Sequence, residues 1–262
     1  MGDELLVRRS GQAATVVINR PDQRNAVTYD MWREFPSVFA ELDADPAIRV
    51  VLVTGEGDKA FSAGADIKDF QETRSTPVKS RNYRAAVESA CESLANLSKP
   101  SIVALRGYCI GGGFELAIHG DIRVGDDTTQ IGLPAAKRGI VIGHAFLSRL
   151  EHLAGAANTS YMLLSSRLMD ANAALNAGLM SVVVPAADLD SFVNGLVEDI
   201  AQNSPVSHRM HKAVIADLIE HGALSLIPQA RLDLQSTSDV SEDFLEGVRS
   251  FVEKRKPDFP GR

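Results

Sequence analysis

The chain of 262 residues contains little cysteine and few aromatic residues: two cysteines, one tryptophan and 6% aromatic residues in all. Cys91 and Cys109 both lie in apolar surroundings, so two buried free thiols are expected and a disulfide framework is not. The longest apolar runs fall short of the roughly 20 residues of a membrane-spanning helix. The first residues lack the basic and apolar regions of a secretion signal. A cytoplasmic protein without membrane attachment is therefore expected.

The chain has fewer basic than acidic residues, with 27 Lys and Arg against 34 Asp and Glu and a formal net charge of −7. This balance argues against a broad nucleic-acid-binding surface, although it allows a local basic site for a phosphorylated small molecule. Phosphate-loop, zinc-ligand and G-x-S-x-G patterns are absent. Gly55-Glu56-Gly57 lacks the third glycine of a dinucleotide-binding motif, because Ala60 stands there. Neither a metal nor a separate cofactor is expected.

Short apolar strands alternate with helical patterns over the first 200 residues, after which only helical patterns follow. This change predicts an α/β core over residues 1–200 and a helical region over residues 201–262. The expected strands are Ala14–Asn19, Arg49–Thr54, Ser101–Leu105, Ile122–Val124, Gln130–Gly132 and Val182–Val184. The expected C-terminal helices are His208–His221, Pro228–Thr237 and Glu242–Lys254.

The segment Tyr108–Ala117 is the most informative part of the chain, because three consecutive glycines join a strand to a short helix. Glycines let the backbone approach a ligand, and a helix start points free N–H groups at it. Glu115 lies in the first turn of that helix. An acid beside backbone donors suits enolate chemistry. Helix dipoles also favour acids in first turns whatever the function, so the local pattern leaves both interpretations open.

Three other segments have a functional and a structural interpretation. The loop Ser62–Lys68 is rich in small residues, which would let a flat ring or a thioester oxygen lie against the backbone; it is also typical of an ordinary tight loop. His144 lies in a glycine-flanked loop before a helix, a position shared by catalytic histidines and ordinary helix starts. The basic run Lys254–Lys256 could hold phosphates or end a solvated helix.

Taken in order, these segments resemble the enoyl-CoA hydratase/isomerase family, the crotonases, almost from end to end. The strongest match is Gly107–Ala117, followed by Ala60–Lys68. The remaining matches are Asn19-Arg20-Pro21, Arg24-Asn25-Ala26, Lys99-Pro100, Asp121-Ile122, Gly178-Leu179, Glu246-Gly247 and Phe251–Pro257.

The resemblance implies an α/β fold, namely a spiral of strand–strand–helix units followed by helices that drive assembly into a homotrimer or a dimer of trimers. It also implies an acyl-CoA substrate, with coenzyme A as part of that substrate. The backbone N–H groups of Ala65 and Gly112 would form an oxyanion hole for the thioester oxygen, and Glu115 would transfer protons. The residues implied in coenzyme A binding are Arg24, Ala63, Ala65, Asp66, Ile67, Lys68 and Gly112, with Lys254 or Lys256 reaching phosphates either within one chain or across a subunit interface.

The sequence departs from the family pattern at one catalytic position. Hydratases of the family use a second glutamate directly after the proline of Ile131–Pro134, where this chain has Ala135. Alanine cannot transfer protons, which leaves Glu115 as the one matched carboxylate. The leading hypothesis is a lyase of the enoyl-CoA hydratase or dehydratase kind that works with Glu115 alone.

Three alternatives remain from the sequence. A CoA-thioester decarboxylase needs no base to form the enolate, so an oxyanion hole and one proton donor suffice. A hydrolase that cleaves a ring carbon–carbon bond in a CoA thioester could use His144 to activate water. A non-catalytic acyl-CoA-binding protein would keep the oxyanion loop, although it has no evident need for Glu115.

Overall fold

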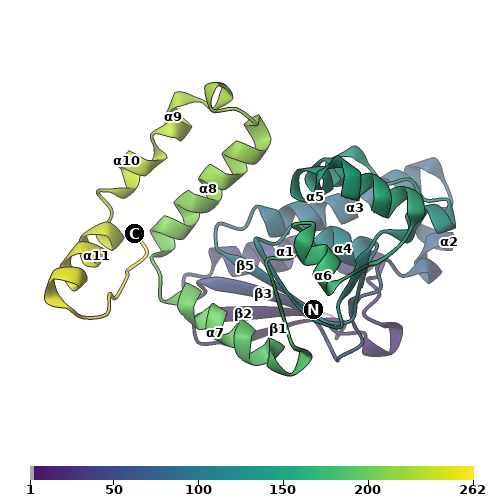
Figure 1. Cartoon of the computed structure of the whole chain (residues 1–262), viewed down its shortest axis with the longest axis horizontal. Helices are drawn as coiled ribbons and strands as arrows, with labels where there is room; N and C mark the ends of the chain where they lie inside the picture. Colours follow the sequence, from purple (N-terminus) through teal and green to yellow (C-terminus); the bar gives the residue numbers. More distant parts are fainter. Residues whose placement is uncertain (1–2) are drawn as a thin grey trace.

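The computed structural model describes residues 3–262, which form two β-sheets, a layer of helices against them and a helical extension (Figure 1). The larger sheet has the strand order β1-β2-β3-β5-β7-β10, and the smaller one β4-β6-β8-β9. The strands are β1 Leu5–Ser10, β2 Ala13–Ile18, β3 Val50–Gly55, β4 Ala60–Ser62, β5 Ser101–Leu105, β6 Tyr108–Ile110, β7 Ile122–Asp126, β8 Gln130–Gly132, β9 Met169–Asp170 and β10 Val182–Val184.

Eleven α-helices connect and extend these strands in the described residues. They are α1 Tyr29–Ala44, α2 Phe70–Thr73, α3 Pro77–Ala95, α4 Gly112–Ala117, α5 His144–Ser165, α6 Ala171–Asn176, α7 Leu189–Ala201, α8 Pro205–His221, α9 Gln229–Leu232, α10 Leu234–Ser238 and α11 Glu242–Glu253. Thr28 caps α1 through its hydroxyl oxygen, which accepts a hydrogen bond from the Met31 N–H.

The strands repeat in pairs, each pair giving one strand to each sheet before a helix returns the chain. β3 and β4 precede α3, β5 and β6 precede α4, and β7 and β8 precede α5. Successive units pair in parallel within both sheets. This arrangement confirms the predicted spiral of strand–strand–helix units, and it brings the turns after β4 and β6 to the same edge of the smaller sheet.

The main core lies between the sheets and helices α1, α3, α4 and α5. Phe35 and Phe39 of α1 stack at 5.6 Å between ring centroids, and Phe114 of α4 meets Phe146 of α5 edge-on at 5.9 Å. A second, smaller core forms where Leu189, among other residues of α7, packs on the opposite face of the larger sheet. Helices α3, α4 and α5 therefore lie together over one end of the smaller sheet.

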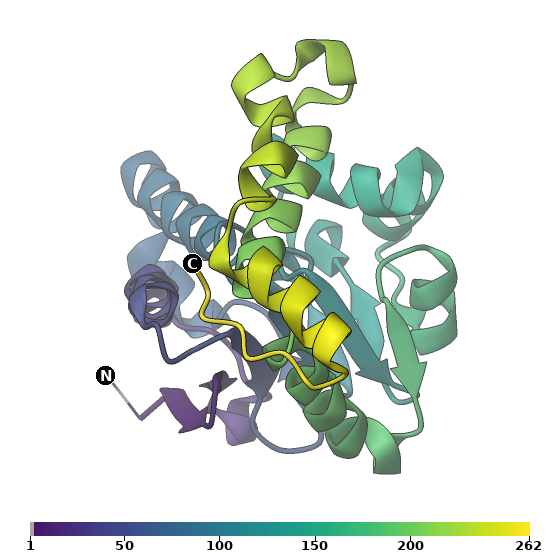
Figure 2. The same ribbon diagram turned by 90° about the vertical axis from the view of Figure 1, so that its left-hand side faces the viewer.

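Helices α8 to α11 extend away from the two sheets in Figure 1, and Figure 2 shows this extension from its far side, in front of the sheets. Many large apolar side chains of this extension are exposed: Val214, Ile215, Leu218, Ile219, Leu224, Leu226, Leu232, Val240, Phe244, Leu245, Val248, Phe251 and Val252. Among residues 3–262, none of the helices combines the length and hydropathy needed to cross a bilayer.

Most predicted elements are present, with differences at their ends and in the shortest strands. The six predicted strands are confirmed to within one or two residues, whereas β1, β4, β6 and β9 were not predicted. The predicted helix Pro228–Thr237 is wrong as a single element, because α9 and α10 meet at Asp233 and form two short helices. The predicted boundary near residue 200 falls between α7 and α8, and a division into two domains there stays a prediction.

Candidate active site

Two glycine turns, one after β4 and one after β6, lie against each other. Gly64 has a φ of +96°, and a Cβ there would lie 2.8 Å from the Ile110 carbonyl oxygen and 3.2 Å from the Gly112 nitrogen. Gly111 also has a positive φ, of +56°. Any larger residue at position 64 would strain the backbone and push the turns apart. Glycine therefore allows the close approach of the two backbones.

This approach places the N–H groups of Ala65 and Gly112 beside one another. A Cβ built on Gly112 would lie 3.6 Å from the Ala65 nitrogen. Within residues 3–262, neither N–H donates a hydrogen bond, and Gly112 is the first residue of α4, whose N–H has no partner inside the helix. Two free donors side by side, one of them at the start of a helix, suit a developing negative charge on one oxygen atom.

The first of these turns is held by Asn25, a buried residue of the loop before α1. The Asn25 side-chain amide donates to the carbonyl oxygens of Glu56 and Ala60 at 2.9 and 2.7 Å. The Ser62 hydroxyl donates to the Asn25 carbonyl oxygen at 2.7 Å and accepts from the Gly64 N–H at 3.1 Å. These buried hydrogen bonds fix the backbone that presents Ala65.

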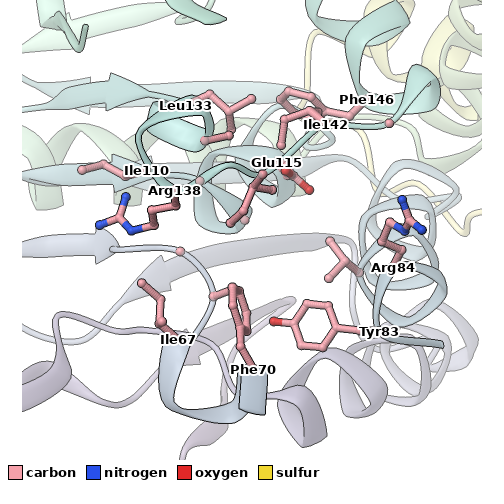
Figure 3. A pocket seen from close by; sticks show the side chains of 18 of the residues that line it. Ile67, Phe70, Tyr83, Arg84, Ile110, Glu115, Leu133, Arg138, Ile142 and Phe146 are labelled. Carbon is pink, nitrogen blue, oxygen red and sulfur yellow. The ribbon is translucent and has the colours of Figure 1, made fainter. Parts of the chain in front are cut away.

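Both turns open into a cavity of about 1000 Å³, including its mouth. In Figure 3, Glu115 lies at its centre, between a wall with Leu133, Ile142 and Phe146 and a wall with Ile67, Phe70 and Tyr83. Arg138 and Arg84 lie toward opposite ends. The lining also includes Trp32, Ala63–Ala65, Arg74, Val87, Glu88, Ile110–Gly112, Pro134, Ala135, Ile140, Val141 and Gly143. The cavity is mainly apolar, and its acidic side chains are those of Glu115 and Glu88.

Glu115 has a pKa far from that of an ordinary glutamate. Burial raises it from 4.5 to about 7, with a smaller increase from the charge of Glu88 and a smaller decrease from Arg74. Within the described residues, no hydrogen bond is made to its carboxylate. A carboxyl group that titrates near neutral pH can both donate and accept a proton under ordinary conditions.

The raised pKa predicts a pH-dependent effect of E115Q on stability. In the unfolded chain the carboxyl group ionises near pH 4.5, but in the fold it does so near pH 7. Stability therefore falls as pH rises between these values, by about 3 kcal/mol for a shift of this size. We expect E115Q to unfold at a higher temperature than the unchanged protein at pH 8, and the difference to shrink at pH 5. Thermal unfolding at both pH values checks this, and a difference independent of pH would contradict it.

Position 135 supplies no acid to the cavity. Ala135 lies in the short 3-10 helix Pro134–Arg138, and its side chain lines the cavity. Of the remaining residues in that helix, Pro134 and Arg138 line the cavity and neither is acidic. The helix Pro134–Arg138 therefore brings no carboxylate to the cavity.

The structure brings some of the predicted coenzyme A residues to the cavity and leaves others outside it. Ala63, Ala65, Ile67 and Gly112 line it. Asp66 is buried beneath the loop, where its carboxylate pairs with Arg20 at 2.9 Å and accepts from the Lys68 N–H at 3.0 Å. The Asp66 side chain therefore shapes the loop in this chain and does not face the cavity.

The other predicted residues lie outside the lining of this single chain. Arg24 is exposed, and its guanidinium lies 5.6 Å from the Tyr108 ring centroid. Lys68 is exposed, as are Lys254, which caps α11, and Lys256. His144 begins α5 with an exposed side chain, although its neighbour Gly143 lines the cavity. Roles for these residues stay predictions.

Several lining residues were not predicted from the sequence as site residues. They come from α1, from α2 and the residue that follows it, from α3, or from the chain after β8. The charged or aromatic ones are Trp32, Phe70, Arg74, Tyr83, Arg84, Glu88, Arg138 and Phe146. Glu88 borders the apolar stripe of α3 that contains Val87 and Cys91, which is the one signal that could have drawn attention to it. Carboxylates beside an apolar stripe are common on surface helices, so the signal is weak.

Known proteins support the resemblance over the whole chain. A family model described as enoyl-CoA hydratase/isomerase matches residues 8–262. The chain belongs to the enoyl-CoA hydratase/isomerase family. It is 34% identical over 261 residues to a protein named probable enoyl-CoA hydratase echA8 of Mycobacterium bovis, covering 99% of both chains. It is 32% identical over 266 residues to the carnitinyl-CoA dehydratase of Proteus mirabilis, covering 100% of both.

Solved structures of this family confirm the fold. The crystal structure of an enoyl-CoA hydratase/carnithine racemase from Magnetospirillum magneticum has a TM-score of 0.95 and 34% sequence identity, covering 100% of this chain and 97% of that one. The enoyl-CoA hydratase of Bacillus anthracis gives a TM-score of 0.93 at 28% identity. The predicted crotonase-like fold and membership of the enoyl-CoA hydratase/isomerase family are therefore confirmed.

Proposed function

We propose that the protein is an acyl-CoA lyase that adds water to the double bond of an enoyl-CoA thioester, or removes it in the reverse direction, without an added cofactor. The observation that supports this most strongly is the placement of two free N–H groups, from Ala65 and Gly112, beside Glu115 in a mainly apolar cavity. Relatives that cover the whole chain are named as hydratases and a dehydratase of CoA thioesters.

In this proposal the thioester oxygen accepts hydrogen bonds from Ala65 and Gly112. When water bonds to the β-carbon of the enoyl group, one of its protons passes to a neighbouring water molecule, and electrons move onto the thioester oxygen to form an enolate, which the two donors stabilise. Glu115, protonated below its pKa of about 7, then gives its proton to the α-carbon. The apolar lining excludes bulk water and strengthens both interactions.

Decarboxylation is the second candidate, and Ala135 is the observation that favours it. Loss of carbon dioxide from a thioester with a β-carboxylate leaves the enolate directly, so no base is required on the wall that Ala135 lines. The oxyanion hole and the proton of Glu115 would complete that reaction. Ring cleavage with His144 as base receives no comparable support, because this side chain lies outside the cavity lining of the chain.

Mass spectrometry of products from a panel of acyl-CoA thioesters tests the proposal. Enoyl-CoA substrates are expected to gain the mass of one water molecule and to keep coenzyme A. A loss of carbon dioxide from malonyl-type thioesters, with no hydration of any enoyl-CoA, would replace the proposal with decarboxylation. Binding without any product would contradict catalysis altogether.

We also propose that the protein assembles as a homotrimer or a dimer of trimers through α8 to α11. These helices expose a series of large apolar residues, including Phe244, Phe251 and Val252, which are 46%, 84% and 75% exposed in the single chain. Apolar surface on this scale favours burial against further copies of the chain. Sedimentation analysis should give the mass of three or six chains, and a stable monomer would contradict the assembly.

A further inference from the structure

A second acid does reach the cavity, from a helix on which the family pattern gave no reason to expect one. Glu88 of α3 lines the main cavity together with Glu115 of α4. Behind Glu115 lies a smaller cavity of about 310 Å³, and both glutamates line it as well. Both side chains therefore line both cavities, where α3, α4 and the start of α5 meet.

The Glu88 carboxylate lies close to the start of α5. A Cβ built on Gly143, the residue that precedes α5, would lie 3.6 Å from Oε1 of Glu88. Gly143 offers no side chain to cap this 22-residue helix. The positive end of the helix dipole therefore favours a negative charge where the Glu88 carboxylate lies.

The two glutamates have contrasting surroundings. Glu88 is exposed to solvent at a helix start, whereas burial raises the pKa of Glu115 to about 7, an effect that the Glu88 charge increases. Two acids in such different surroundings, one exposed and one buried, can divide the roles of proton acceptor and proton donor. Within the described residues, Glu88 has no Lys, Arg or His side chain within salt-bridge distance, so its carboxylate is not already engaged by a cation.

We propose that Glu88 is the second catalytic carboxylate of this enzyme and replaces the glutamate missing at position 135. The inference rests on the proposed hydration. Glu88 and Glu115 hold a water molecule between them at the β-carbon of the substrate. The water oxygen bonds to the β-carbon, its proton passes to Glu88, and the π-electrons move toward the thioester. The proton of Glu115 then bonds to the α-carbon.

The smaller cavity gives this cycle a route to restore both acids. Glu88 can release its new proton to solvent because its side chain is exposed. Glu115 can be reprotonated by water on the side away from the substrate. His119 also lines this cavity, and its Nδ1 lies 2.7 Å from the Glu115 carbonyl oxygen. Burial lowers the pKa of His119 to about 4, so it stays neutral and does not compete for the proton.

The test compares E88Q with E151Q in steady-state hydration of crotonyl-CoA, together with the dissociation constant of a non-reacting acyl-CoA. Glu151 is the control, because it is an exposed acid of α5 that lines neither of the two cavities. We expect E88Q to lower kcat by about 100-fold or more, as for a lost acid–base group, with the dissociation constant unchanged. E151Q should stay within about twofold of the unchanged enzyme, since its loss removes no group from the reacting water or from the smaller cavity.

A second variant separates proton transfer from a merely structural role. E88A opens the site to small acids, and added formate should raise its kcat about tenfold or more, because formate supplies a proton acceptor in the vacated space. Turnover of E88Q close to that of the unchanged enzyme would overturn the inference, as would a low turnover of E88A that formate does not raise. If the unchanged enzyme hydrates no enoyl-CoA, the proposed function itself fails; if it does and E88Q hydrates equally well, only the role of Glu88 fails.

Discussion

Replacing Glu115 with glutamine should reduce turnover by about 100-fold or more while acyl-CoA binding is retained. Glutamine has nearly the same shape as the protonated acid but cannot give a proton to the α-carbon. Because the fold holds this group neutral up to about pH 7, the substitution also leaves the cavity's charge almost unchanged below that pH. Steady-state kinetics of E115Q with an enoyl-CoA, at equal substrate saturation, measure the loss.

The pH profile provides the internal control for this prediction. Donation from Glu115 requires the protonated acid, so activity of the unchanged enzyme should fall as pH rises through about 7. The same decline should be absent from the residual activity of E115Q. Near-normal turnover in a folded E115Q, or an identical pH profile in both proteins, would remove Glu115 from the mechanism.

Replacing Gly112 with proline should lower kcat/KM by about 100- to 1000-fold relative to the Gly112→Ala variant. Both substitutions add a Cβ that would lie 2.9 Å from Cζ2 of Trp32, so both require this ring to shift. Proline alone removes the N–H. It is also well tolerated as the first residue of a helix, the position that Gly112 occupies in α4.

The comparison between the two Gly112 variants separates the loss of the N–H, with the proline ring that replaces it, from the effect of the added Cβ, which is common to both. Circular dichroism and thermal unfolding should show the same folded state for Gly112→Ala and Gly112→Pro. Equal kcat/KM values in the two folded variants would show that the Gly112 N–H does not stabilise the thioester oxygen in the transition state.

The sequence predicted the backbone part of the site well because glycine leaves a strong signal. Gly111 and Gly64 have positive φ angles, and Gly64 lies so close to the neighbouring backbone that a larger residue would not fit. Both positions are therefore recognisable in the sequence as glycines. The absence of an acid at position 135 was also visible, since a single alanine stands where the family pattern has glutamate. The predicted spiral followed from the same ordered set of segments.

The cavity walls were harder to predict, because they depend on how distant helices pack. In the sequence, Glu88 and Arg84 look like ordinary polar residues of an amphipathic helix. Their place in the cavity depends on the packing of α3 beside α4 and the start of α5. Asp66 shows the opposite situation: it lies in a matching motif, but its carboxylate pairs with Arg20 and accepts a hydrogen bond from the loop backbone. Sequence position alone does not tell a lining side chain from one that supports the loop beneath it.

The central claim is that Ala65, Gly112 and Glu115 together stabilise a thioester enolate. Ultraviolet difference spectroscopy of bound acetoacetyl-CoA tests it most directly, because the enolate of this ligand absorbs where the keto form does not. The account predicts that binding to the unchanged protein increases the enolate fraction at a pH where the free ligand is mostly keto, and that Gly112→Pro lowers this increase more than Gly112→Ala does. Tight binding of the ligand in its keto form would contradict the claim.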